Sequence, residues 1–141
     1  MASLRRRGRI LAMRALCQRD VQGDFADEGL VDFLQTWEES PEARAYARTL
    51  VTVFQRQRQQ VDDRIAAACD NWDFSRVSPV DRNVMRVAVV EMLGAKVPVK
   101  VALNEAIEIA REYGGADSPR FVNGVLDTIR KRLEKPGRKV D

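Results

Sequence analysis

The sequence predicts an all-α protein, and two kinds of observation support this fold class. Apolar residues recur every three to four positions through most of the 141 residues, which is the period of amphipathic helices. Serine as the N-cap followed by proline at the first helical position is typical of a helix start, and it occurs at Ser40-Pro41, Ser78-Pro79 and Ser118-Pro119. No strand pair or hairpin is convincing. The hydrophobic content of 45% suffices for one compact domain, or for two small bundles sharing a core.

About six to seven helices are expected, and the periodic segments set their approximate bounds. These segments are Arg6–Val21, Leu30–Trp37, Pro41–Trp72, Pro79–Leu93, Lys100–Tyr113 and Pro119–Leu133. Gly23 ends the first. The second lies in an acidic segment, residues 24–43, which has seven acids and no lysine or arginine. The third is long for one helix, so we expect a kink or break in the polar stretch from Gln57 to Gln60.

The segment from Pro79 to Leu93 is apolar on nearly all sides, which predicts a central helix. Its run "VAVV" alone would also suit a strand, but the cap at Ser78 and the length of the segment favour a helix. The next helix has a buried apolar stripe and an exposed polar face, and Gly114-Gly115 ends it.

The last helix contains two conflicting signals, the cap at Ser118-Pro119 and the turn-like pair Asn123-Gly124. A helical wheel favours the helix, because the apolar residues after Phe121 fall in one arc of about 40–140° from it. Gly124 inside this helix costs roughly 1 kcal/mol relative to alanine. Phe121 lies at the edge of the arc beside Gly124, so its ring could stack on an unpaired base, worth roughly 1–3 kcal/mol. Alternatively, Phe121 caps the core and Gly124 allows close helix packing.

Charge is distributed unevenly along the chain, whose net charge is +3. Residues 1–20 carry a net charge of +5 and residues 130–141 carry +4, whereas residues 21–129 carry −6. Basic ends around an acidic middle suggest a polyanion site near the termini, although solubilising tails are the alternative. The densest basic feature lies at the start of the first helix and consists of Arg5, Arg6, Arg7 and Arg9. Guanidinium groups at a helix N-terminus suit phosphate; a frayed tail is the alternative.

Several classes of protein are excluded or disfavoured. The chain has no histidine, which excludes histidine-based acid–base and triad catalysis. It has no phosphate-binding glycine loop, nucleophile elbow or metalloprotease motif, so we expect no enzyme activity, no metal and no cofactor. Cys17 and Cys69 stand far apart, which favours reduced thiols and a cytoplasmic protein. No apolar run is long enough to span a membrane, and none follows the N-terminal arginines as in a signal peptide.

Three segments resemble the bacterial transcription antitermination family NusB: "RRRGRILAMRALCQRD", "WDFSRVSPVDRNVMRVAVVEML" and "VALNEAIEIAREYGGADSPRFVNGVLDTI". The resemblance runs in order from Arg5 to Leu133. It implies an all-α fold of two small helical bundles packed across each other, without catalytic activity. In this chain the subdomains would be residues 1–75 and 76–133 of a single domain, followed by a basic tail at 134–141.

The resemblance also implies partners and site residues. Members of this family bind the boxA element of ribosomal RNA leader transcripts with NusE, a small-subunit ribosomal protein, and join RNA polymerase to suppress termination. The family's RNA surface maps onto Arg5, Arg6, Arg7, Arg9, Asp117, Ser118, Arg120 and Phe121. Its NusE-facing surface maps onto Trp72, Asp73, Asp81 and Arg82, with Asp81 and Arg82 expected in an exposed turn. Where some members have an aromatic residue on the RNA surface, this chain has Cys17, which cannot stack on a base.

Two alternatives remain open at the level of sequence. The first is a homodimeric protein-interaction module with a masked RNA surface, whose basic ends meet an acidic partner surface such as residues 24–43. The second is the NusB-like domain of an RNA methyltransferase, which is disfavoured because the chain ends at Asp141, without room for a catalytic domain.

Overall fold

The computed structural model describes residues 3–23, 28–69 and 73–134, and all regular structure in these ranges is helical. The elements are α1 (Leu4–Gln22), α2 (Leu30–Trp37), α3 (Pro41–Ala68), the 3₁₀ turn η1 (Phe74–Arg76), α4 (Pro79–Gly94), α5 (Val99–Tyr113) and α6 (Ser118–Leu133). The predicted all-α fold is confirmed. The largest difference in bounds is at α3, which ends at Ala68 rather than near Trp72.

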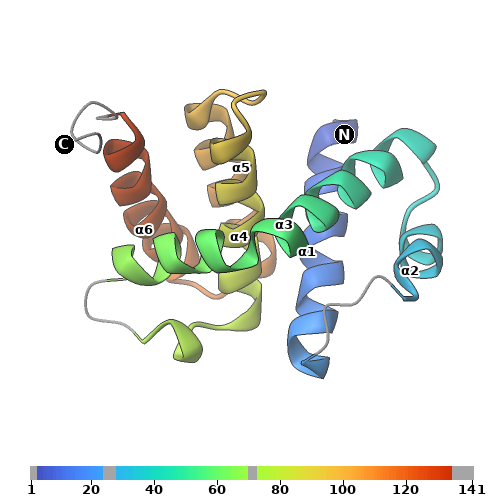
Figure 1. Cartoon of the computed structure of the whole chain (residues 1–141), viewed down its shortest axis with the longest axis horizontal. Helices are drawn as coiled ribbons and strands as arrows, with labels where there is room; N and C mark the ends of the chain where they lie inside the picture. The colour runs from blue at the N-terminus through green and yellow to red at the C-terminus, as the bar shows by residue number, and fades with distance from the viewer. Residues whose placement is uncertain (1–2, 24–27, 70–72, 135–141) are drawn as a thin grey trace.

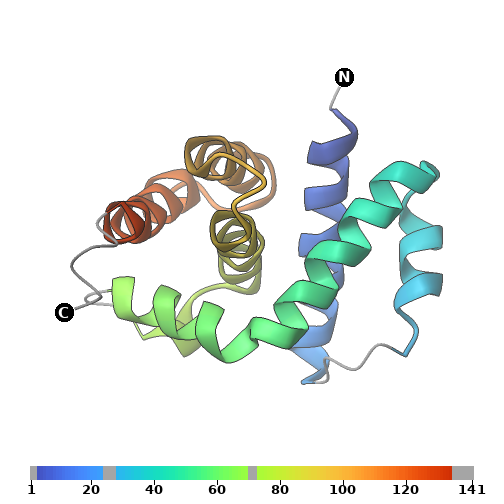
Figure 2. The ribbon, with the colours of Figure 1, turned by 45° about the horizontal axis from the view of Figure 1, so that its top comes forward.

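The helices form two groups that α3 joins. In Figure 1, α1, α2 and the first half of α3 lie on one side, while α4, α5 and α6 lie on the other. The turned view in Figure 2 shows α3 crossing from the first group to the second. The buried apolar residues of both groups form one continuous cluster, so the two groups share a core. The boundary proposed between residues 75 and 76 falls inside η1, and the division into two subdomains stays a proposal.

Local signals explain where most helices begin, bend and end. The hydroxyl oxygens of Ser40 and Ser78 accept hydrogen bonds from the backbone N–H groups of Ala43 and Asp81, both at 3.2 Å, which confirms both predicted caps. Gly23 ends α1 in the left-handed conformation, at φ 73°. The predicted kink in α3 occurs at Gln57, whose φ of −112° and ψ of 17° are not helical.

The predicted cap of α6 is wrong in one respect. Ser118 is the first residue of the helix, not its N-cap, which is Asp117. The Ser118 hydroxyl instead accepts a hydrogen bond from the Gly115 N–H at 2.9 Å. The reason is the tight turn after α5, where a Cβ on Gly114 would lie only 2.5 Å from the Ser118 hydroxyl oxygen. The glycine therefore lets the chain fold back onto the start of α6.

The predicted central position of α4 is confirmed. Its residues from Asn83 to Met92 are all buried, including the charged side chains of Arg86 and Glu91. These charges need partners inside the protein, because an unpaired buried ion is costly. Among the helices that the structure describes, none combines the length and apolar character needed to cross a membrane.

Candidate nucleic-acid interface

The predicted basic cluster forms the first two turns of α1 rather than a frayed tail. The helix starts at Leu4, and the Ser3 hydroxyl accepts a hydrogen bond from the Arg6 N–H at 3.0 Å. Gly8 lies within the cluster and is buried. A Cβ there would lie 2.9 Å from the Tyr46 ring and 3.1 Å from the Ala43 carbonyl oxygen. Gly8 thus allows α1 to lie directly against α3, which holds the arginines in place.

Arg6 and Arg7 lie at the surface, but each already has a carboxylate partner. Arg6 donates to both carboxylate oxygens of Glu105, at 2.9 and 2.6 Å, and Arg7 forms the same two-point contact with Glu38. The hydrogen bonds from Arg6 and Arg7 hold the pKa of Glu105 and Glu38 below the ordinary value of a glutamate. Both arginine side chains remain about one-third exposed, at 35% and 36%. A phosphate can therefore reach them only in competition with these carboxylates.

Arg9 is buried, which corrects the expectation that all four arginines present their charge to a phosphate. Only 4% of this residue is exposed. Its Nε atom donates to both carboxylate oxygens of Glu91, at 2.8 and 2.9 Å, and its Nη1 atom donates to Glu105 at 3.1 Å. Burial alone would lower the pKa of Arg9, but the hydrogen bond to Glu91 and the negative charges of Glu91 and Glu105 together raise it. Arg9 therefore links α1 to α4 and α5 inside the protein.

Tyr46 completes this buried cluster. Its hydroxyl donates a hydrogen bond to Glu91, and burial, followed by this contact, raises the pKa of Tyr46 to about 12. Its ring also lies 5.4 Å from the guanidinium carbon of Arg5. Arg5 is exposed and, among the described residues, forms no ion pair. Of the four arginines, Arg5 is thus the one whose charge is most available.

Further along α1, Arg14 lies between two aromatic rings that sequence reasoning did not connect. Its guanidinium carbon is 5.1 Å from the Trp37 ring centroid and 5.2 Å from the Tyr113 ring centroid. Trp37 is 56% exposed, although it is a large apolar residue. The three side chains line a hollow of about 480 Å³ between α1, α2 and the end of α5. An exposed tryptophan held by a cation is a suitable platform for stacking a base.

Cys17 lines the same hollow. Its sulfur lies 3.6 Å from the Asn83 amide nitrogen, which donates to it, and burial raises the pKa of the thiol. Cys17 thus remains a protonated thiol at neutral pH and offers no ring. The aromatic surface in this hollow comes from Trp37 and Tyr113 instead.

The junction between α5 and α6 carries the remaining predicted RNA-binding residues. Asp117 and Arg120 are exposed, whereas Ser118 is buried and its hydroxyl is engaged by Gly115. Phe121 is partly buried and packs against the core with part of its side chain accessible, as the helical wheel predicts.

The junction begins next to α1, because Tyr113 at the end of α5 lies against Arg14 of α1. Arg6 contacts Glu105 and Arg14 contacts Tyr113, so eight residues, or about 12 Å of helix, separate the two contacts on both helices. We use the name α1 surface for the accessible residues around α1 and the start of α6. They are Arg5, Arg6, Arg7, Arg14, Trp37, Asp117, Arg120 and Phe121.

Gly124 lies inside α6 and is exposed. A Cβ built on Gly124 would meet nothing within 4 Å, so the alternative that this glycine permits close helix packing is wrong.

Replacing Gly124 with alanine is therefore expected to raise the free energy of unfolding by roughly 1 kcal/mol, because alanine favours the helix and restricts the unfolded chain. Urea unfolding monitored by circular dichroism measures this change. A lower free energy of unfolding for Gly124→Ala would contradict this prediction, because it would mean that the added methyl group meets other atoms in solution.

Comparison with known proteins identifies the family. The NusB family model matches residues 6–131. The chain belongs to the NusB family. The transcription antitermination protein NusB of Anaeromyxobacter dehalogenans strain 2CP-1 is 43% identical over 134 residues, covering 94% of each chain. The NusB protein of Anaeromyxobacter sp. strain Fw109-5 is 41% identical over 142 residues, covering 100% of this chain and 99% of its own.

Solved structures of NusB proteins share the fold. The NusB structure from T. maritima superimposes with a TM-score of 0.79 at 36% identity, covering 93% of each chain. A structure of the antitermination factors NusB and NusE in complex with double-stranded RNA gives a TM-score of 0.80 at 25% identity, covering 94% of this chain and 99% of that one. The helical arrangement described above is therefore that of NusB structures.

The turn at the start of α4, which the NusB resemblance assigns to NusE, differs from expectation. Asp81 is only 9% exposed and the Arg82 side chain only 14%, so the expected exposed turn is wrong. Arg82 is drawn inward because its Nε atom donates to Asp20 of α1 at 2.7 Å. Burial alone would raise the pKa of Asp20, but the hydrogen bond from Arg82 and the charge of Arg86 lower it.

The remaining residues of that predicted surface have different positions. Asp73 is exposed and caps η1, its carboxylate accepting from the Ser75 N–H at 2.9 Å. Trp72 lies outside the described residues. The carboxylate oxygen Oδ1 of Asp81 is buried and, within the described part of the chain, has no hydrogen-bond partner.

Proposed function

We propose that this chain is an RNA-binding transcription antitermination factor that binds the boxA element of ribosomal RNA leader transcripts together with NusE. Membership of the NusB family supports the function class. The observation that carries the RNA site is the position of accessible guanidinium groups next to an exposed tryptophan on the α1 surface. Arg7 pairs with Glu38, which directly follows Trp37 in sequence. The bound transcript would carry the protein into the cytoplasmic RNA polymerase complex.

The chemistry of the α1 surface divides into two parts. Arg5, Arg6 and Arg7 supply phosphate contacts, which position the strand without reading its sequence. Trp37 and Phe121 supply rings on which unpaired bases can stack. The exposed carboxylate of Asp117 can accept a hydrogen bond from a base amino group. Stacking of this kind requires unpaired bases, so single-stranded boxA is the proposed ligand.

The proposal is tested by titrating labelled boxA RNA with the protein, with and without NusE, at two salt concentrations. We expect boxA to bind more tightly than a scrambled RNA of the same length or a boxA duplex. We also expect NusE to strengthen the binding. Each phosphate contact on a single strand contributes about −0.7 to the slope of log affinity against log salt. Equal affinity for boxA and scrambled RNA in the presence of NusE would overturn the proposal.

Glu38 is proposed to restrain RNA binding by occupying Arg7. Replacing Glu38 with glutamine is expected to release Arg7, raise RNA affinity severalfold, and make the salt slope steeper by about 0.7. The Ser40 N–H donates a hydrogen bond to the Glu38 carboxylate at 2.8 Å, and glutamine keeps a side-chain oxygen that can accept it. Fluorescence anisotropy with labelled RNA measures both quantities.

The matched control is Glu39→Gln, because Glu39 is the exposed neighbouring glutamate and has no ion pair among the described residues. It removes the same charge without releasing an arginine. An equal gain in affinity in both variants would show that only net charge matters.

The position of Trp37 on the α1 surface leads to a spectroscopic prediction. In a Trp72→Phe background, Trp37 is the only tryptophan, because the chain contains two. Stacking of a base on its ring is expected to quench its fluorescence as boxA is added, with the same midpoint as binding measured by anisotropy. Unchanged emission at saturation would exclude Trp37 from the RNA site.

The alternative of a homodimer with a masked RNA surface stays a prediction without specific support. It requires the basic end of one chain to meet an acidic surface, such as residues 24–43, of another. In this structure Glu38 of that segment pairs with Arg7 of its own chain. Light scattering across protein concentration, with and without RNA, distinguishes the two states.

A further inference from the structure

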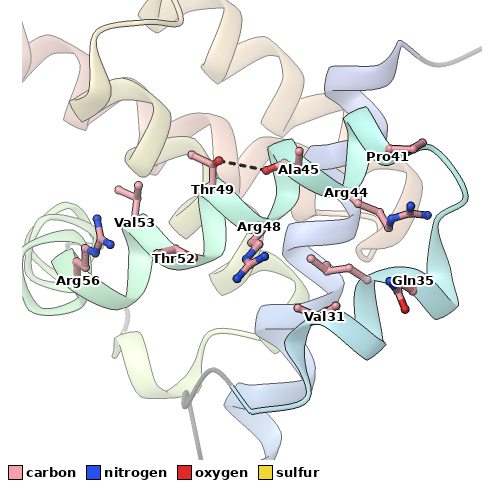
Figure 3. Close-up of a pocket in the computed structure, with 11 residues that line it drawn as sticks. Val31, Gln35, Pro41, Arg44, Ala45, Arg48, Thr49, Thr52, Val53 and Arg56 are labelled. Carbon is pink, nitrogen blue, oxygen red and sulfur yellow. Dashed lines mark hydrogen bonds between the residues drawn. The ribbon is translucent and has the colours of Figure 1, made fainter.

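A second groove lies between α2 and the first half of α3, away from the α1 surface (Figure 3). Its volume is about 560 Å³. Tyr46 of α3 points towards the buried Glu91. Arg48, which lines the groove, follows two residues later and therefore lies about 200° further around the α3 axis. The groove is therefore on the opposite side of α3 from the cluster that anchors α1.

Three arginines lie along this groove, and no acidic residue lines it among the residues that the structure describes. Arg44, Arg48 and Arg56 are separated by four and eight residues, and Figure 3 shows them spread along the length of α3. The absence of acids is notable because residues 21–129 carry a net charge of −6. The groove is thus a positive site in a negative part of the sequence.

None of the three arginines forms an ion pair with a described residue, so their charges are not neutralised there. Arg44 donates to the carbonyl oxygens of Glu38 and Glu39 at the end of α2, both at 2.8 Å. Arg48 and Arg56 are exposed and form no ion pair within the described ranges, whereas Arg58 on the same helix lies 3.9 Å from Asp62. Eight residues of helix, about 12 Å, separate Arg48 from Arg56.

Apolar side chains lie between these arginines, together with the polar side chains of Gln35, Thr49 and Thr52. Val31 is 45% exposed and is one of the few large apolar side chains that reach the surface. Leu34 of α2 also lines the groove and is buried, and Val53 of α3 is partly buried. An apolar strip bordered by unpaired cations is suited to a ligand with apolar residues on one face and carboxylates beside them.

We propose that this groove binds an acidic amphipathic helix of a partner protein. The apolar side chains of that helix would lie against Val31 and Val53. Carboxylates seven or eight residues apart on the helix would match the spacing of Arg48 and Arg56. A nucleic-acid strand is a poorer fit, because none of the described residues lining the groove is an aromatic one that could stack on a base. The site is separate from the RNA function and does not depend on it.

The test uses a fluorescein-labelled helical peptide of about 18 residues, with leucines at i, i+3, i+4 and i+7 and glutamates on both flanks. Fluorescence anisotropy measures its affinity for the full chain, and a peptide with lysines in place of the glutamates is the charge control. The groove is altered by Arg48→Glu with Arg56→Glu, and separately by Val31→Asp. The matched control is Lys96→Glu with Lys100→Glu, because both lysines are exposed, lie outside the groove and give the same change in charge.

We expect the glutamate peptide to bind at least 10-fold more weakly to either groove variant, and to bind the lysine control within about twofold of the original chain. Circular dichroism melts establish that all variants fold. No saturable binding of the glutamate peptide to the original chain, or equal binding of the lysine peptide, overturns the proposal. A loss of RNA affinity in the arginine variant would assign the groove to RNA. A loss of concentration-dependent dimerisation would assign it to a second copy of the chain. Either result also overturns the proposal of an acidic partner helix.

Discussion

Replacing Arg9 with methionine is expected to lower the free energy of unfolding by about 3–5 kcal/mol, which is typical when one partner of a buried ion pair is removed. Arg9 and Glu91 are each only 4% exposed, and methionine would leave the Glu91 carboxylate buried beside Tyr46 without its counter-ion. Urea unfolding at neutral pH, followed by circular dichroism, measures the change from the midpoint and slope of the transition.

Two further variants make the Arg9 prediction specific. Arg6→Met removes an arginine that shares Glu105 with Arg9 but is one-third exposed, so its cost should stay below about 1 kcal/mol. Arg9→Met combined with Glu91→Leu should recover much of the lost stability, because an apolar pair can replace a buried ion pair. Unchanged stability of Arg9→Met with a loss of RNA affinity would instead mean that Arg9 serves the phosphate contacts.

Replacing Phe121 with alanine is expected to weaken boxA binding by roughly 5- to 150-fold, which corresponds to the 1–3 kcal/mol of one stacked base. The cost in stability should be smaller than the 3–5 kcal/mol of a fully buried phenylalanine, because Phe121 is only partly buried. Anisotropy titration with boxA and NusE measures the affinity, and thermal unfolding measures the stability.

Phe121→Leu separates stacking from packing. Leucine fills most of the space against the core but has no ring, so this variant should be as stable as the original chain and still bind RNA weakly. If Phe121→Leu binds boxA as tightly as the original chain, while Phe121→Ala loses stability and affinity together, the residue serves the core rather than the RNA.

Most of the secondary structure could be predicted from the sequence because its determinants are local. Ser40 and Ser78 each act on an N–H three residues away, and the polar stretch around Gln57 predicts the kink in α3. Ser118 was mispredicted because the tight turn at Gly114 gives its hydroxyl a different donor. The helical wheel of α6 correctly placed Phe121 at the edge of the core, because a regular helix fixes the angle between residues.

The roles of the basic residues could not be predicted in the same way. Four arginines within five positions are alike in sequence, yet Arg5 is exposed, Arg6 and Arg7 are paired at the surface, and Arg9 is buried. The difference depends on carboxylates at sequence separations of 31, 82 and 99 residues. Arg82 was misplaced for the same reason, since its partner Asp20 is 62 residues away.

The amino-acid sequence by itself therefore determined the helices, the caps at Ser40 and Ser78, the kink and the family of this protein, because each depends on neighbouring residues or on their order. The tertiary structure decided which charges reach solvent and which rings meet. Arg9 became an internal counter-ion and Arg14 came to lie between Trp37 and Tyr113 because helix packing brought distant segments together. The energy of a charge depends on its distance from its partners and on its burial, and both are properties of the folded chain.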